Sequence, residues 1–533
     1  MSVVQAATAL SAAYAVFVVG RLLAKREPGD RLIAINAGPL AMPISGFWPP
    51  KGWLGNSWAH FLRAAFDRFG QTVIPCIFPL TAERYIYVGD AAACKMIMND
   101  RHAFIKDVKA YAVISFFGEN IVGTEGDTWV RHRSIARKSF GERNNALLWT
   151  ETVRTLEDWF APWDAEIGAQ GGKITANLTE SMRDITLFII ASAGFGLQFS
   201  RTTLGEKREG YALPFGKALF TAIETMFHRV LAPRWLYSLP IESLRKSDEA
   251  YSELQRYIKQ MIAEARASGA APGADAESSE AADLFRRLVD ANDEEQGARL
   301  TDDELLSNIY VFFLAGHETS AHTLTFAFAL LALHPEVQDK LYEEAKRLWP
   351  EDSGEQWSTS KLPDYNRLEY ALAVFRETLR LFPAEVAMQR VSVNDTTLPS
   401  QIRNAAGQWQ PARLPVKAGT VCVLDIHAVH MSPLDWGEDA ERFRPERFID
   451  SPGYEWPRDA WIPFTGGPHV CLGQRFATVE SVCILARMAR KYRISPTPEI
   501  AKLPKDEQWR RLTKWTVGIT STPGRVDLSF EKR

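Results

Sequence analysis

The sequence has few cysteines and no strong excess of charge of either sign. Its five cysteines, at positions 76, 94, 422, 471 and 483, show no CxxC spacing, which predicts a reducing compartment, no disulfide bonds and no zinc site. The net charge is −3 and 24% of the residues are charged, a balance that argues against a nucleic-acid-binding protein. No repeat of fixed period is visible. A disulfide scaffold, a zinc protein and a repeat protein are therefore all disfavoured.

The body of the chain also lacks a clear linker, although 533 residues would allow three domains. We predict one large domain over residues 51–533. Long amphipathic stretches predict helices at 181–194, 214–230, 248–267, 302–333 and 335–348. Two short stretches rich in Ile, Val and Tyr predict strands at 72–76 and 84–88. The expected fold class is mainly α with a small β portion, and the acidic low-complexity stretch 268–282 is expected to be a surface loop.

Charge is absent from residues 3–20. As a helix this stretch would measure about 27 Å, which nearly crosses a bilayer core. Basic residues follow at once from Arg21, and none precedes, so the positive-inside rule places the body on the cytoplasmic side. We predict an uncleaved transmembrane anchor at 1–24 and a proline-containing linker at 25–50. A cleaved signal peptide is the alternative, but it would begin with a basic region that this chain lacks.

The most informative segment is Phe464-Thr-Gly-Gly-Pro-His-Val-Cys471-Leu-Gly. Its pattern predicts a loop that holds the Cys471 thiolate under a flat cofactor, with Phe464 shielding the sulfur. Gly466, Gly467 and Gly473 allow close backbone approach or positive φ. A predicted helix over 474–490 directs its N-terminus toward the sulfur. The alternative is a buried structural cysteine, which several matching positions at fixed spacing disfavour.

A second pattern, Glu377-Thr-Leu-Arg380, lies in a stretch with helical apolar spacing over 370–382. Glu377 and Arg380 share a helix face, and such a pair is usually a solvated salt bridge of a few tenths of a kcal/mol. The flanking leucines indicate burial instead. A buried pair needs further partners, and Arg447 of the segment Phe443-Arg-Pro-Glu-Arg-Phe448 is the candidate.

Together with Ala315-Gly-His-Glu-Thr319, these segments resemble the cytochrome P450 family of haem-thiolate monooxygenases, in the order that this family shows. The resemblance extends from about Trp53 to the C-terminus and is nearest to the eukaryotic, microsomal and fungal-like branch. It implies the P450 fold and heme b (iron protoporphyrin IX) with Cys471 as its axial thiolate ligand. One departure is His469, which stands where the family often has arginine, so its contact with a haem propionate is expected to be weaker or pH-dependent.

The resemblance also assigns roles in the predicted helix 302–333, where apolar character is interrupted at 315–319. We expect Gly316 to make room for a ligand and Thr319 to bond back to the carbonyl of Ala315, which would open the helix. By resemblance Thr319 orients dioxygen and Glu318 relays protons with water. A polar patch facing solvent is the alternative.

Four further residues are expected around the haem propionates. Trp129 and Arg133 offer an indole N–H and a guanidinium one helical turn apart, a pair suited to a carboxylate. Arg390 and His469 correspond by resemblance to the other propionate contacts. Arg133 as a plain surface charge is the alternative.

The expected reaction is insertion of one oxygen atom from O₂ into an apolar small molecule, by hydroxylation or epoxidation, in terpenoid or other secondary metabolism. NADPH-cytochrome P450 reductase is the expected electron donor, docked on a basic surface of Arg131, Arg137 and Lys138. The protein is expected to be a monomer in the endoplasmic reticulum membrane, single-pass, with its catalytic domain cytoplasmic and no nucleic acid bound.

The alternatives are a haem-thiolate isomerase or dehydratase that acts on peroxides without a reductase, and a non-catalytic haem sensor. Segments expected by resemblance to line the substrate pocket are 110–122, 309–315, 384–388 and 515–519. Their main side chains are Phe116, Phe117, Phe312, Phe313, Val386, Met388, Trp515 and Val517. Within this apolar set Glu385 either meets a polar group of the substrate or faces solvent. The sequence leaves the substrate and the position of attack open.

Overall fold

The structure is a computed structural model, and it describes residues 31–32, 66–78, 83–169, 171–197, 206–232, 234–267, 284–294, 299–350, 361–517 and 520–533. The predicted anchor (1–24), most of the predicted linker (25–50) and the acidic stretch 268–282 lie outside these residues. Among the helices that the structure describes, none is both long and apolar enough to span a bilayer.

Helices make up most of the described chain, as predicted. The α-helices are α4 (Ala91–Asn99), α5 (Gly126–Ser139), α6 (Glu142–Ala169), α7 (Leu178–Ile189), α8 (Phe215–Glu224), α9 (Met226–Leu231), α10 (Glu242–Ala267), α11 (Leu284–Glu294), α12 (Asp302–Leu333), α13 (Pro335–Leu348), α15 (Glu369–Leu381), α16 (Ile426–His430), α17 (Pro433–Trp436), α18 (Gln474–Lys491), α19 (Pro498–Ala501) and α20 (Lys505–Leu512). Short helical turns include η1 (Val108–Ile114), the π-helical η2 (Ile190–Gly194), η4 (Arg234–Ser238), η6 (Pro445–Phe448) and η8 (Gly467–His469).

The strands form small separate sheets. The largest holds, in spatial order, β1 (Arg31–Leu32), β2 (Val73–Phe78), β3 (Glu83–Val88), β9 (Val421–Asp425), β6 (Ala387–Ser392) and β4 (Phe104–Lys106). A second joins β10 (Tyr492–Pro496), β13 (Asp527–Lys532) and β5 (Lys173–Asn177). Two pairs are β7 (Thr396–Arg403) with β8 (Trp409–Val416), and β11 (Trp515–Val517) with β12 (Ser521–Pro523).

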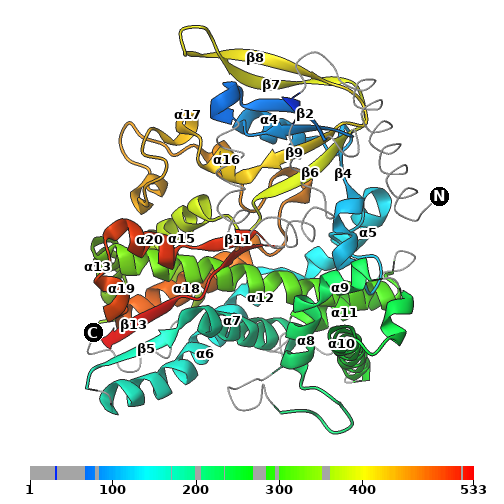
Figure 1. Ribbon diagram of the computed structural model, residues 1–533. Helices are drawn as coiled ribbons and strands as arrows, with labels where there is room; N and C mark the ends of the chain where they lie inside the picture. Colours follow the sequence, from blue (N-terminus) through cyan, green and yellow to red (C-terminus); the bar gives the residue numbers. More distant parts are fainter. Residues whose placement is uncertain are drawn as a thin grey trace, which may run out of the picture.

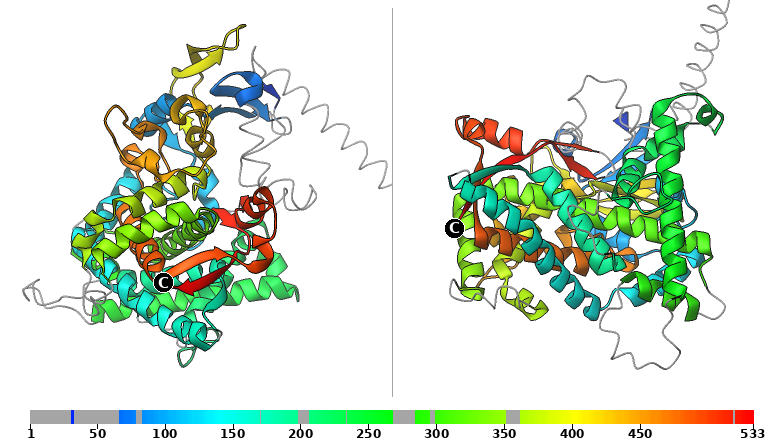
Figure 2. Two further views of the ribbon diagram at one scale, coloured as in Figure 1. Left: turned by 90° about the vertical axis from the view of Figure 1, so that its left-hand side faces the viewer. Right: turned by 90° about the horizontal axis from the view of Figure 1, so that it is seen from below.

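Helix α12 crosses the middle of the molecule, with the largest sheet and the β7–β8 hairpin on one side of it (Figure 1). It packs against α7, α15 and α18, and the two further views show the same helices gathered around it (Figure 2). A capping box starts α12, because the Thr301 side chain accepts from the Glu304 amide and the Glu304 carboxylate accepts from the Thr301 amide. The helix is unbroken over its 32 residues, so the predicted opening at 315–319 is wrong.

Several predicted elements are confirmed within a few residues, among them α10, α12, α13, α15 and α18. Helix α6 was missed. Its sequence contains Pro162, which lacks an amide proton and normally ends a helix. Its buried face carries three tryptophans, Trp149, Trp159 and Trp163, and their burial outweighs the lost hydrogen bond.

Candidate active site

The Cys471 loop joins η8 to the start of α18. The Cys471 amide donates to the Phe464 carbonyl over 2.9 Å, and α18 begins three residues later at Gln474. Burial raises the pKa of the Cys471 thiol, while the amides of Gly473 and Gln474 and the Arg133 guanidinium act in the opposite sense. The loop therefore aims two N–H groups and one cation at the sulfur, an arrangement that stabilises a thiolate.

The position of Cys471 indicates an internal space. Cys471 is exposed to solvent, yet protein surrounds it closely enough that desolvation raises the pKa of its thiol. Both facts hold if the thiol lies deep in the molecule and borders a hollow. Ala315 is likewise exposed although it lies at the middle of the largely buried helix α12.

Backbone strain is concentrated in the same loop. Thr465 has φ 62°, and it is the only non-glycine residue with positive φ among those described; for a β-branched residue this is a true outlier. Gly467 has φ 63°, and a Cβ there would lie 2.2 Å from the Met98 carbonyl oxygen, so only glycine fits. Gly466 is extended at φ −159° and Gly473 has φ −85°, so Gly467 is the one of the three glycines that takes the positive φ.

The predicted propionate-binding residues come together beside this loop. The rings of Trp129 and His469 lie 4.0 Å apart, and Arg133 lies over Trp129 at 5.5 Å while donating to the Val470 carbonyl over 3.1 Å. His469 Nε2 lies 3.5 Å from Glu125 Oε1. Burial lowers the pKa of His469, and Glu125 only partly opposes this, so the ring is neutral at pH 7.

A third cation, Lys106, was missed in the sequence. It lies opposite Arg390 in the β4–β6 pairing, and like charges directly opposite on neighbouring strands repel each other. Burial lowers the pKa of Lys106 to about 8, with Arg390 and Arg133 acting in the same sense and Glu125 opposing it. Its Nζ donates to the carbonyls of Ile121 and Val122 over 3.1 and 3.0 Å. The sequence gives only a weak sign of this role, because Lys106 is a single lysine at the end of the short segment Phe104–Lys106.

These cations lack counter-ions of their own. Within the described part of the chain, no carboxylate lies within ion-pair distance of Lys106, Arg133 or Arg390. Glu125 is the acid that acts on Lys106. Burial opposes its ionisation, yet hydrogen bonds from His469 and from two backbone amides lower its pKa to about 2. Three interior cations around a hollow that borders a cysteine fit a flat cofactor bearing two carboxylates.

The predicted site residues on α12 are Gly316, Glu318 and Thr319. Thr319 Oγ1 donates to the Ala315 carbonyl over 2.7 Å, and desolvation raises the pKa of Glu318 to about 7. A Cβ at Gly316, however, would lie 3.0 Å from Cδ1 of Ile190. Gly316 therefore lets α12 approach η2, and its role in making room for a ligand stays a prediction.

The Glu377 cluster is complete in itself. Arg380 forms a two-point pair with Glu377, Nε to Oε2 over 2.6 Å and Nη2 to Oε1 over 2.8 Å, with both side chains fully buried. Arg447 Nε lies 3.5 Å from Glu377 Oε1 and its Nη2 lies 2.7 Å from Asp439 Oδ1. Two buried arginines thus meet two carboxylates, and the exposed Arg444 also pairs with Asp439 over 3.1 Å.

Some residues expected in the pocket belong to cores instead. Phe313 is fully buried and stacks on Phe195 with ring centroids 3.7 Å apart. Met388 lies in the core beneath the largest sheet. Phe117 and Val517 are partly buried against the main core. Ile519 lies outside the described residues.

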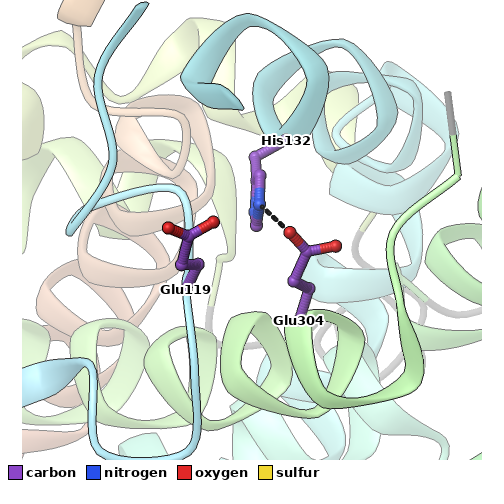
Figure 3. Close-up of side chains that lie close together, drawn as sticks. All are labelled: Glu119, His132 and Glu304. Carbon is purple, nitrogen blue, oxygen red and sulfur yellow. Dashed lines mark hydrogen bonds and ion pairs between the residues drawn. The ribbon is translucent and has the colours of Figure 1, made fainter. Parts of the chain in front are cut away.

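A second cluster, Glu119, His132 and Glu304, has the residue types of a metal site (Figure 3). Its cation is already present, because Arg131 donates to both Glu304 oxygens over 2.6 and 2.8 Å and lowers the pKa of Glu304 to about 2. The Asn308 amide donates to Nδ1 of His132, which puts the ring proton on Nε2, facing Glu304. We therefore assign this cluster no metal. Arg131 is committed to this pair, which removes it from the predicted basic docking surface.

Comparisons with known proteins agree with this geometry. The family model "Cytochrome P450" matches residues 38–526. The chain is 37% identical over 466 residues to cytochrome P450 monooxygenase 124 of Postia placenta, covering 86% of this chain and 84% of that protein. It is 30% identical over 335 residues to cyclooctat-9-en-7-ol 5-monooxygenase of Streptomyces melanosporofaciens, covering 63% and 65%. The chain therefore belongs to the cytochrome P450 family, as the resemblance predicted, and it is a monooxygenase of the oxidoreductase class.

Proposed function

We propose that the protein is a haem-thiolate monooxygenase that inserts one atom of O₂ into a C–H or C=C bond of an apolar small molecule in secondary metabolism. Electrons come from NADPH through a P450 reductase. The observation that carries this proposal is the hollow bordered by Cys471, with three interior cations that have no carboxylate at ion-pair distance among the described residues.

The residues fit heme b. Cys471 would be its axial ligand, and Arg133, Arg390 and Lys106, with Trp129 and His469, would hold its propionates. When bound, the haem supplies activation of dioxygen. Phe464, Gly466 and Gly473 shape the backbone around the sulfur, while Glu377, Arg380 and Arg447 fix the helix and segment behind it.

Proton delivery falls to α12. The Thr319 hydroxyl donates a hydrogen bond to the Ala315 carbonyl. The hydroxyl oxygen can still accept a hydrogen bond from a group in the hollow. Burial holds the pKa of Glu318 at about 7, which keeps a transferable proton near neutral pH. Thr319 therefore positions the oxygen species and Glu318 supplies protons by way of water.

A terpenoid substrate is supported by one relative, whose name says that it acts on cyclooctat-9-en-7-ol. A rearrangement of peroxides without a reductase is the second candidate reaction. The Thr319 and Glu318 pair favours the monooxygenase, because an isomerase consumes no external protons.

For localisation we propose a single-pass protein of the endoplasmic reticulum membrane, with an anchor at 1–24, a linker at 25–50 and a cytoplasmic catalytic domain at 51–533. Exposed apolar side chains near η4 support a membrane contact of the body as well: Trp235 is 65% exposed, Leu239 43% and Ile241 39%. The reductase would dock near Arg137 and Lys138, which are exposed on α5.

The deciding test is spectroscopic. Cys471→Ser should abolish the carbon monoxide difference band of thiolate-bound ferrous haem, and Cys483→Ser should keep it, because Cys483 is fully buried in α18. An unchanged band in Cys471→Ser rejects the proposal. Turnover of an organic peroxide at full rate without NADPH and reductase would decide for the isomerase.

A further inference from the structure

Glu385 also lies deep in the protein, and the proposed reaction does not use it. The residue follows α15, in the turn that leads to β6. The carbonyl of Ala384 accepts from the Ser521 amide over 2.8 Å, and that of Val386 accepts from the Ile426 amide over 2.9 Å. Because two different elements, β12 and α16, hold its neighbours, the backbone of Glu385 is fixed.

The side chain borders the same hollow as Cys471. Glu385 is only partly buried by its accessible surface, yet desolvation raises the pKa of its carboxyl to about 7. Its negative charge acts on both the Cys471 thiol and the Tyr111 hydroxyl, raising the pKa of each. Because Glu385 is surrounded by protein and is still partly accessible, as Cys471 is, we infer that its carboxyl faces the same internal space and not bulk solvent.

No protein group satisfies this carboxylate. Within the residues that the structure describes, no hydrogen bond or ion pair reaches Glu385. Arg390 opposes the rise in the pKa of Glu385, but its guanidinium lies beside the Tyr111 hydroxyl. A carboxylate without a hydrogen-bond partner costs binding free energy unless the ligand supplies that partner.

We propose that Glu385 is a specificity-determining residue that accepts a hydrogen bond from a hydroxyl group of the substrate. This inference rests on the proposed monooxygenase function and narrows its substrate class. The substrate is then an apolar alcohol, not a plain hydrocarbon, and a carboxylic acid is repelled. The reaction that supplies it must already have placed a hydroxyl group on the skeleton, either by oxygen insertion or by addition of water.

The test uses holoenzyme and matched probes on two skeletons: decalin, decahydro-2-naphthol and decahydronaphthalene-2-carboxylic acid, and drimane with its 11-hydroxyl and 11-carboxyl derivatives. Dissociation constants come from the change in haem absorbance on binding. In the wild type at least one alcohol should bind about tenfold more tightly than its hydrocarbon. Glu385→Leu should remove that difference and admit the acid, while Glu385→Gln, whose amide oxygen still accepts, should keep most of it.

Glu499→Leu is the matched control, because Glu499 is exposed on α19, and it should leave all constants unchanged. Haem content and the carbon monoxide band are measured for every variant. If the wild type lacks that band, the proposed function itself fails. If the band is normal but no alcohol binds better than its hydrocarbon, or Glu385→Leu keeps the preference, the inference about Glu385 alone is overturned.

Discussion

Two groups of buried charge in this molecule look alike in the sequence and differ in one respect. In the Glu377 cluster, two arginines face two carboxylates and the group is closed. Around Cys471, Lys106, Arg133 and Arg390 face no carboxylate at ion-pair distance in the described part of the chain. The Glu377 cluster stabilises the fold, whereas the three cations around Cys471 can bind an anionic ligand. Charge balance, more than burial, separates a structural cluster from a binding site.

Breaking the closed cluster should have the largest effect. Glu377→Gln removes one carboxylate and leaves Arg380 and Arg447 buried with too few partners, which costs about 3–5 kcal/mol of unfolding free energy. We expect little soluble, haem-loaded protein, measured by yield and by the midpoint of thermal unfolding. The control is Glu446→Gln in the same segment, whose carboxylate pairs with the exposed Lys340. Equal stability of the Glu377 variant and the control would show that the cluster is not structural.

Changing the open cluster should affect ligand binding more than folding. Lys106→Met removes one of two opposed cations but also the donor to two carbonyls, so the unfolding free energy of the haem-free protein should change by less than about 2 kcal/mol. Haem affinity should fall about tenfold, measured by the rate of haem transfer to apomyoglobin. Lys95→Met is the control, since Lys95 pairs with Asp459 at the surface. Normal haem retention in Lys106→Met would remove Lys106 from the propionate site.

The two clusters also show which residues the sequence could place and which it could not. Residues tied to regular helical spacing were placed well, because Glu377 and Arg380 fall on one face of α15 at any reasonable boundary. Lys106 could not be placed, since its role depends on the pairing of β4 with β6, whose strands are almost 300 residues apart. The side chain that packs against Gly316 could not be predicted for a similar reason. Sequence shows that a side chain is missing, but only the packing of α7 and η2 shows that Ile190 fills the place.

A further test concerns the buried carboxyl of Glu318. Glu318 has no charged partner among the described residues, and burial raises its pKa from 4.5 to about 7. The group keeps its proton below pH 7 and loses it above, so product formed per NADPH should fall severalfold as pH rises from 6 to 8. Glu318→Gln should give a low, pH-independent yield with more peroxide. A wild-type yield that is flat over this range would exclude Glu318 as the proton source.

The smallest effect is expected for Gly316, on the side of α12 that packs against Ile190. Gly316→Ala gains about 1 kcal/mol of helix propensity, but its Cβ would lie 3.0 Å from Cδ1 of Ile190, and overpacking of this kind costs about 1–3 kcal/mol. We expect a net loss of unfolding free energy of about 1 kcal/mol, with haem content unchanged. Ile190→Val removes the Cδ1 atom, so in that background Gly316→Ala should stabilise the protein. A double-mutant cycle measured by chemical denaturation checks the sign. If Gly316→Ala is equally destabilising in both backgrounds, the contact with Ile190 is not the reason for glycine, and the side of α12 that faces η2 is not closed by packing.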